Sequence, residues 1–470
     1  MASLKLFLML IWCCLGESGR QKLLIGGLFG IDTSRGGWNS AGIIPAVRMA
    51  IEDINNSTDI LKDYELKLAI KDAKCNIGES VKALVEYISI GDPKIMILGP
   101  GCSKSTMPVA EAAHYWNIIQ IGFSSATPLL SSKSTFPLYF RTNPSEHYSN
   151  LGRVAIVKRF KWQRVAILQM NNDAFTGITN SLANLLKKNN ISIVAYESFI
   201  DHPRLAIENL KKKDARIIFG FFYIKELYMV FCEAFKQGLY GDKYVWILVS
   251  GRYEGKWWNV SSPKRVECTS EELRQGMSNV IGTGEMKLSP TDDPTVSGKT
   301  PSQLHSRYLE RVVNSSYHVN LFSSYGYDAA WTCALTLNAS IPILSSMNLT
   351  LKDFSYRSSA IRRVFVDILK NISFTGMTGK IRFDRNFDRI TKLDITQIQG
   401  DSQRRVALYD MENNSYIDDT HSSYQWTGNY VPVDGLRITN KELTISSLAV
   451  LVCDCIVIDW HHLCLFCLDL

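Results

Sequence analysis

Histidine is scarce in this chain, and the short motifs that mark common enzyme active sites are absent. Only 8 of the 470 residues are histidine, and two of them, His461 and His462, lie near the C-terminus. There is no Gly-x-Ser-x-Gly elbow, no Gly-x-Gly-x-x-Gly turn and no histidine-rich metal motif. A hydrolase or transferase would need a nucleophile with a base in reach. We therefore expect a binding protein rather than an enzyme, with no metal and no cofactor.

A basic stripe is also missing. The formal net charge of +7 is modest for 470 residues, and positive side chains gather only in short runs such as residues 211–213. A nucleic-acid-binding surface needs a concentrated basic face, so we expect no nucleic-acid partner. Hydrophobic residues make up 46% of the chain and charged residues 21%, which is an ordinary globular balance. The length suits about two or three domains.

Both ends of the chain carry apolar stretches that are short for a membrane span. Residues 6–15 are apolar, follow one lysine and precede small residues, a pattern that predicts a signal peptide over residues 1–19. An uncleaved anchor is the alternative. The tail, residues 443–470, is apolar and cysteine-rich but is interrupted by Asp454 and Asp459. Because a membrane helix needs about 20 mostly apolar residues, we interpret the tail as a truncated or degenerate first membrane helix, with membrane attachment left open.

Sequons of the form Asn-X-Ser/Thr recur along the chain and favour an exported glycoprotein. The candidate glycosylation sites are Asn55, Asn56, Asn190, Asn259, Asn314, Asn338, Asn348, Asn371 and Asn413.

Four cysteines, Cys75, Cys102, Cys232 and Cys268, are spread through the globular part of the chain. In an oxidising compartment they suit two disulfides, for which three pairings exist. We favour Cys75–Cys102 and Cys232–Cys268, because each closes a moderate loop between neighbouring elements. A zinc site is the rival interpretation, but these cysteines lack the paired Cys-x-x-Cys spacing.

Apolar strands alternate with amphipathic helices over most of the chain. In the first cycle this alternation covers residues 22–31, 41–55, 64–70, 77–89, 94–98, 106–116 and 118–123. A second cycle runs from residue 160 to residue 249. Such alternation predicts an α/β fold of two lobes, each a mainly parallel sheet with helices on both faces. We expect the first lobe to contain residues 22–146 and 276–355, and the second lobe residues 147–275 and 356–435.

The sequence Pro-Gly-Cys-Ser at residues 100–103 is the most informative motif. It follows a buried strand and precedes an alanine-rich helix, so it places Ser103 at a helix N-terminus. Unpaired amides and the positive end of the helix dipole suit a small carboxylate there. The alternative is that Ser103 only caps its own helix.

From about residue 24 to residue 431, ordered blocks of sequence resemble the extracellular ligand-binding region of metabotropic GABA (type B) receptor subunits. The matching blocks include GGW at 36–38, PAVRMAIEDIN at 45–55, PGCS at 100–103, YGYDAAW at 325–331 and FTGMTGKIRFD at 374–384. The resemblance implies a periplasmic-binding-protein type I fold (a Venus flytrap) that closes on a ligand between its lobes. It also implies the Cys75–Cys102 and Cys232–Cys268 pairing.

The same resemblance implies a class C G-protein-coupled receptor at the extracellular side of the cell membrane. Its partners would be GABA or a related small amino-acid-like carboxylate, and a related receptor subunit with which it forms a heterodimer through the first lobe. A G protein would be a partner only where a membrane domain is present in the full-length product.

Four positions match ligand-binding residues of the family. Trp38 matches a tryptophan over the ligand, and Ser103 matches a serine that holds its carboxylate. Ser125 belongs to the small-residue loop beside the carboxylate. Tyr223 matches a tyrosine of the second lobe that closes on the ligand.

Four further positions depart from the family pattern and are weaker ligand-binding candidates. Ala126 replaces a second serine, Asn143 replaces a histidine, and Arg252 stands near the place of a tryptophan. Phe322 falls where the family has an acid that pairs with the ammonium of GABA. If that alignment is displaced, Glu310 or Asp328 is the candidate acid.

Three interpretations therefore remain at this stage. The chain binds GABA or a different carboxylate, it is the non-binding partner subunit of a heterodimer, or it is a secreted decoy or binding protein of the same fold.

Overall fold

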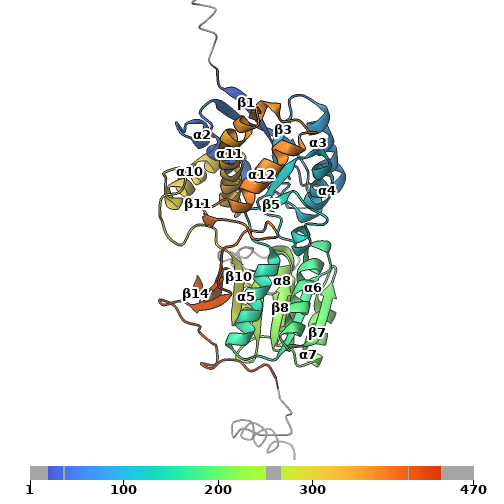
Figure 1. The fold of residues 1–470 in the computed structure, drawn as a ribbon. Coiled ribbons are helices and arrows are strands. Elements are labelled where there is room, and N and C mark those ends of the chain that lie inside the picture. Colours follow the sequence, from blue (N-terminus) through green and yellow to red (C-terminus); the bar gives the residue numbers. More distant parts are fainter. Residues whose placement is uncertain (1–18, 35–37, 250–265, 401, 436–470) are drawn as a thin grey trace, which may run out of the picture.

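The computed structural model describes residues 19–34, 38–249, 266–400 and 402–435. They form two lobes, one above the other, with the chain crossing between them more than once (Figure 1). All but the last residue of the expected signal peptide lies outside the described residues, as do the tail, Arg252 and Asn259. Among the described helices, none combines the length and the apolar character that crossing a membrane requires.

The first lobe is built on a five-stranded parallel sheet in the order β2-β1-β3-β4-β5. Its strands are β1 (Gln21–Phe29), β2 (Tyr64–Asp72), β3 (Lys94–Leu98), β4 (Ile119–Gly122) and β5 (Tyr139–Arg141). Every residue of β3 is buried, because this strand lies in the middle of the sheet with helices on both sides.

Side chains at the end of β3, residues 96–98, alternate between two hydrophobic cores. Met96 and Leu98 pack in the core that contains α2 (Ile44–Asn55), α10 (Pro301–Val313), α11 (Ser323–Ser346) and α12 (Ser359–Asn371). Ile97 packs in the opposite core with α3 (Ile77–Ser89) and α4 (Ser103–Ala113). This is the two-residue alternation of a strand covered on both faces.

The second lobe contains an eight-stranded sheet in the order β15-β14-β13-β10-β9-β8-β6-β7. The parallel strands are β6 (Arg164–Met170), β7 (Ser192–Phe199), β8 (Ile217–Phe221), β9 (Val245–Val249) and β10 (Val280–Glu285). Antiparallel strands complete the sheet: β13 (Lys392–Gln399), β14 (Ser402–Asp410) and β15 (Ser415–Asp418).

Helices cover both faces of the second sheet. One core holds α5 (Glu146–Arg159) and α6 (Asp173–Lys188). The other core holds α7 (Arg204–Lys212), α8 (Ile224–Gln237) and α9 (Ser270–Gly276). The predicted two-lobed α/β fold with mainly parallel sheets is thus confirmed.

Two parts of the chain lie in lobes other than those expected from their sequence positions. β10 was expected in the first lobe, but it pairs with β9 and β13 in the second sheet. α12 was expected in the second lobe, but Ile361, Phe365 and Leu369 pack in the first-lobe core. An amphipathic helix or a buried strand fits either sheet, so its pattern alone does not identify the lobe.

Buried arginines hold the crossings between the lobes. The Arg141 guanidinium contacts Asp388 at 2.6 Å from Nε to Oδ1 and donates to the carbonyl of Ser125 at 2.9 Å. Arg389 donates to the carbonyl of Thr142 at 3.0 Å. Both arginines are fully buried. Because a buried charge is retained only when it is paired and hydrogen-bonded, these contacts fix the chain where it crosses between the lobes.

The structure contains the disulfides Cys75–Cys102 and Cys232–Cys268, which confirms the favoured pairing. The first joins the loop after β2 to the start of α4, and the second joins α8 to the segment before α9. Cys333 is a buried free thiol.

The described sequons differ in the accessibility of the asparagine side chain. Asn55 pairs with both backbone groups of Leu66, at 3.0 and 2.9 Å, and Asn338 accepts from the Leu61 amide at 2.9 Å. The exposed sequon asparagines are Asn56, Asn190, Asn314, Asn348, Asn371 and Asn413. A glycosylated asparagine must be accessible, so these six are the stronger candidates.

Candidate ligand-binding site

Ser103 occupies the first helical position of α4, at the carboxyl end of β3. The residue before it, Cys102, is the N-cap, and no side chain caps this helix. The alternative that Ser103 caps its own helix is therefore wrong. Ser103 is half-buried, and no hydrogen bond within the described part of the chain uses its hydroxyl. The hydroxyl and the amides of Ser103 and Lys104 thus lie at the helix N-terminus, while the Ser105 and Thr106 amides donate to the Cys102 carbonyl.

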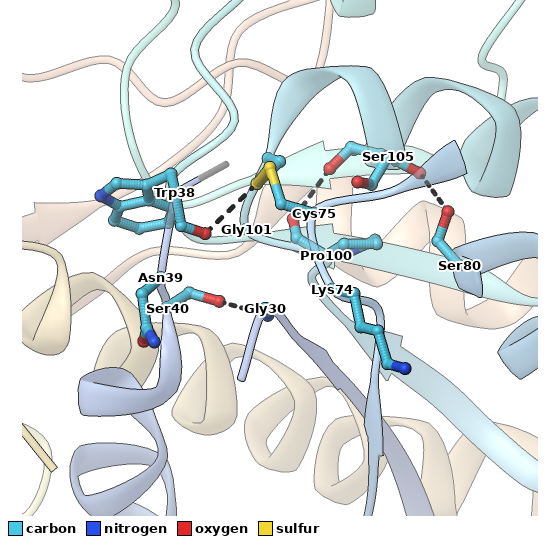
Figure 2. Close-up of a disulfide and its surroundings, with 12 residues drawn as sticks. Gly30, Trp38, Asn39, Ser40, Lys74, Cys75, Ser80, Pro100, Gly101 and Ser105 are labelled. Atoms are coloured by element: carbon cyan, nitrogen blue, oxygen red, sulfur yellow. Dashed lines mark hydrogen bonds between the residues drawn. A yellow bond between two sulfur atoms is a disulfide. The ribbon is translucent and has the colours of Figure 1, made fainter. Parts of the chain in front are cut away.

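The turn between β3 and α4 depends on glycine at two positions. Gly99 has a φ of +80°, and a Cβ there would lie 2.3 Å from the carbonyl oxygen of Leu28. A Cβ on Gly101 would lie 2.7 Å from Cζ3 of Trp38 and 2.8 Å from Cβ of Ser40. The Trp38 ring therefore lies directly against the turn that leads to the helix N-terminus. Figure 2 shows this ring beside Gly101 and the Cys75–Cys102 disulfide.

Phe322 brings a second aromatic ring to the same place. Its centroid lies 5.6 Å from that of Trp38, with the ring planes at 86°. Asn320 fastens the two segments together: its Nδ2 donates to the Asn39 carbonyl at 3.2 Å, and its Oδ1 accepts from the Phe322 amide at 2.9 Å. We call the pair Trp38 and Phe322 the aromatic corner. The sequence places these residues far apart, and tertiary packing brings them together.

Neither alternative acid serves this corner. Asp328 is fully buried and accepts hydrogen bonds from the Met377 amide at 2.6 Å and from the Thr378 amide and hydroxyl at 3.0 and 2.5 Å. Burial raises the pKa of Asp328, although the Arg389 charge opposes this shift. Glu310 is exposed on α10, and no contact within the described residues joins it to the aromatic corner.

Ser125 and Ser124 occupy different environments in the loop after β4. Ser125 is fully buried, and its Oγ lies 2.6 Å from Oγ1 of Thr106 and 3.3 Å from the carbonyl oxygens of Pro100 and Gly101. Its hydroxyl therefore braces the turn. Ser124 is half-buried and donates to the Gly101 carbonyl at 2.9 Å. Ser124 lies in the same serine pair, at the carboxyl end of β4, but was not among the predicted ligand-binding residues.

Ala126 and Asn143 are both buried. Ala126 is 6% exposed, and Asn143 is fully buried, with Nδ2 donating to the Pro144 carbonyl at 3.2 Å. The Asn143 Oδ1 has no hydrogen-bond partner. The side chain of Asn143 therefore lies inside the first crossing between the lobes and does not reach an open surface.

Tyr223 is the predicted ligand-binding residue of the second lobe that lies within the described part of the chain. It is the N-cap residue of α8, directly after β8, and it remains 38% exposed. Its ring centroid lies 4.9 Å from that of Phe175 in α6. Parallel strands carry their functional loops at their carboxyl ends, and Tyr223 has this position in the second sheet as Ser103 has in the first.

Comparisons with known proteins agree with this arrangement. The family described as "Receptor family ligand binding region" matches residues 43–401. Gamma-aminobutyric acid type B receptor subunit 1 of Mus musculus is 36% identical over 423 residues, which cover 89% of this chain and 43% of the relative. Subunit 2 of Homo sapiens is 33% identical over 372 residues, covering 78% of this chain and 39% of the relative. The chain thus spans less than half the length of these relatives.

Proposed function

Because this chain belongs to the family of receptor ligand-binding regions, we propose that it binds GABA or a related small carboxylate between its two lobes and closes to signal. The observation that carries the proposal is the uncapped N-terminus of α4, where Ser103 lies next to the Trp38 ring. The relatives are named as receptors, and we propose that this chain has no catalytic activity.

The carboxylate end of the ligand would bind at the start of α4. Its oxygens would accept hydrogen bonds from the Ser103 hydroxyl and from amides of the first turn, and the helix dipole would favour its negative charge. The half-buried hydroxyl of Ser124 is the nearby second donor, provided that it gives up its bond to Gly101. Trp38 would cover the ligand chain.

Closure would bring Tyr223 of the second lobe onto the ligand. A ligand shifts an open–closed equilibrium only as far as it binds the closed form more tightly, so Tyr223 would supply affinity that the open form lacks. The buried arginines at the crossings give the movement a defined hinge.

The proposed partner is a related receptor subunit, docked on the first lobe. Three large hydrophobic side chains of this lobe are exposed on α3 and just after α4: Ile77 at 54%, Val85 at 48% and Tyr115 at 75%. Exposed apolar side chains of this kind favour a protein interface. We place the chain at the extracellular side of the cell membrane, with a G protein as partner only where a membrane domain follows.

One observation favours a second candidate function, that of the non-binding partner subunit. The aromatic corner contains Phe322, and the two candidate acids do not serve it, because Asp328 is buried against Met377 and Thr378 and Glu310 is exposed on α10. A subunit that does not bind GABA has no need of an acid there.

Calorimetric titration of the full chain with GABA, glutamate and glycine tests the proposal. We expect saturable binding of at least one of them, and Ser103→Ala should weaken it by about tenfold or more, because a hydrogen bond to a charged group is lost. Ser359→Ala is the matched control, since Ser359 is also the first residue of a helix but is exposed on α12. Silence with every ligand from folded protein would favour the partner-subunit function instead.

A further inference from the structure

We infer that the site selects carboxylates whose far end is apolar and uncharged over those that end in an ammonium group. This inference rests on the proposed function, because it concerns the same pocket. Two observations support it. The Phe322 ring lies against Trp38, and the nearby acids Asp72 and Asp328 accept hydrogen bonds from other parts of the chain.

Four residues lie in order between the proposed carboxylate end of the ligand and the aromatic corner. Ser103 begins α4, and Gly101 lies two residues before it in the turn. The Trp38 ring touches Gly101, and the Phe322 ring stands edge to face against Trp38 at 5.6 Å. A ligand whose carboxylate is bound at Ser103 and whose chain runs along Trp38 therefore has Phe322 near its far end.

Phe322 is held in this position from several sides. Its amide is bonded to Asn320, which is itself bonded to the segment that carries Trp38. Its ring centroid also lies 5.9 Å from that of Tyr325. These hydrogen bonds and the ring contact thus hold Phe322 in its position against Trp38.

Two acids near these segments, Asp72 and Asp328, are already engaged. Both carboxylate oxygens of Asp72 accept backbone amides, those of Ile31 and Asp32 at 2.8 and 2.9 Å. Asp328 is fully buried under the turn at Met377 and Thr378. An ammonium group that leaves water for this corner would therefore lose hydrogen bonds and find no free carboxylate among these two acids.

Moving an apolar end group from water to the aromatic corner is favourable. A methyl group has no hydrogen bonds to lose, and contact with two aromatic rings removes its surface from water. A quaternary ammonium group is the intermediate case, because it has no N–H donors and an aromatic face attracts its charge. Comparison of ligands that differ only in this end separates the three cases.

Titration of the full chain with GABA, pentanoate and 4-(trimethylammonio)butanoate tests the inference. Pentanoate is GABA with a methyl group in place of the ammonium, so both present the same carboxylate and nearly the same chain. We expect pentanoate to bind about tenfold more tightly than GABA, as expected for burial of one apolar group without a desolvated charge. Tighter binding of the trimethylammonio compound than of pentanoate would overturn the inference, since a cation would then be preferred.

Variants at Phe322 test the role of the aromatic corner directly. Phe322→Glu should reverse the preference, with GABA gaining and pentanoate losing affinity, whereas the matched control Phe322→Leu should still favour pentanoate. Thermal unfolding checks that both variants fold. If they do not, the affinities of the unaltered chain for GABA and pentanoate still decide the inference. Tighter binding of GABA than of pentanoate by the unaltered chain would overturn this inference and leave the proposed function standing. Binding of neither would overturn this inference, and the titrations with glutamate and glycine would then decide the proposed function.

Discussion

At the residue scale, the proposed site depends on Gly101, which has no side chain. Gly101 allows the Trp38 ring to lie against the turn, because even a single methyl group at this position would come within 2.7 Å of Cζ3 of the ring. Contacts this short do not occur between real atoms, so either the turn or the ring would have to move. The position of the proposed ligand cover is thus set by the absence of a Cβ.

Gly101→Ala should therefore displace Trp38, weaken ligand binding and lower the free energy of unfolding by about 1–3 kcal/mol through overpacking. Calorimetric titration and tryptophan fluorescence measure the two effects. Gly78→Ala is the matched control: Gly78 lies in α3, where an added Cβ meets only Oδ1 of Asn76 at 3.4 Å. That control should leave binding unchanged and raise stability by up to about 1 kcal/mol, since alanine is the better helix former. Unchanged binding in Gly101→Ala would contradict the proposed position of the ligand.

At the element scale, the crossings between the lobes are held by buried charge. The Arg141–Asp388 pair has side-chain exposures of 0% and 3%, and Asp388 also accepts from the Ser131 hydroxyl at 2.5 Å. The pair joins β5 of the first lobe to the segment that leads to β13 of the second sheet. Such a pair holds the crossing segment against β5, because neither charge tolerates separation from the other.

Asp388→Asn should lower the free energy of unfolding by about 3–5 kcal/mol, because it leaves the buried Arg141 charge uncompensated. Urea denaturation monitored by circular dichroism measures this cost. The control is Asp418→Asn, which breaks the Arg159–Asp418 pair, whose side chains are 50% and 54% exposed. An exposed pair contributes less than about 1 kcal/mol, so equal costs for the two variants would refute the role of Arg141 and Asp388 as a hinge fastening.

At the scale of the whole molecule, the two disulfides close loops of similar size but serve different lobes. Cys75 and Cys102 are 27 residues apart in the first lobe, and Cys232 and Cys268 are 36 residues apart in the second. Loop-closure entropy assigns each a stabilisation of about 3.5–4 kcal/mol. Only the first adjoins the binding site, since Cys102 directly precedes Ser103.

Removal of each disulfide by paired alanine substitutions should separate stability from binding. We expect the Cys75→Ala/Cys102→Ala and Cys232→Ala/Cys268→Ala variants to lose similar unfolding free energy, measured by denaturant titration. Ligand affinity should fall strongly only in the first variant, because the N-terminus of α4 loses its anchor. An equal loss of affinity in both would mean that the disulfides act on binding through overall stability alone.

Sequence by itself determined the elements and the position of Ser103 at a helix N-terminus. The order of buried strands and amphipathic helices follows from the spacing of apolar residues, which is a local property of the chain. The position of Ser103 at the start of α4 follows from the Gly-Pro-Gly turn after β3 for the same reason. The disulfide pairing was also within reach, because the paired cysteines belong to neighbouring elements.

Only the tertiary structure decided which of the candidate side chains are buried and which are in contact with one another. Ser125 matched the family pattern but is buried against Thr106, whereas its neighbour Ser124 is half-buried beside the turn. The contact between Trp38 and Phe322, and the lobe to which α12 belongs, likewise depend on segments that are distant in the chain. The spacing of apolar residues reports the periodicity of one element, whereas burial and ring contacts are set by packing between elements, which leaves no local pattern to read.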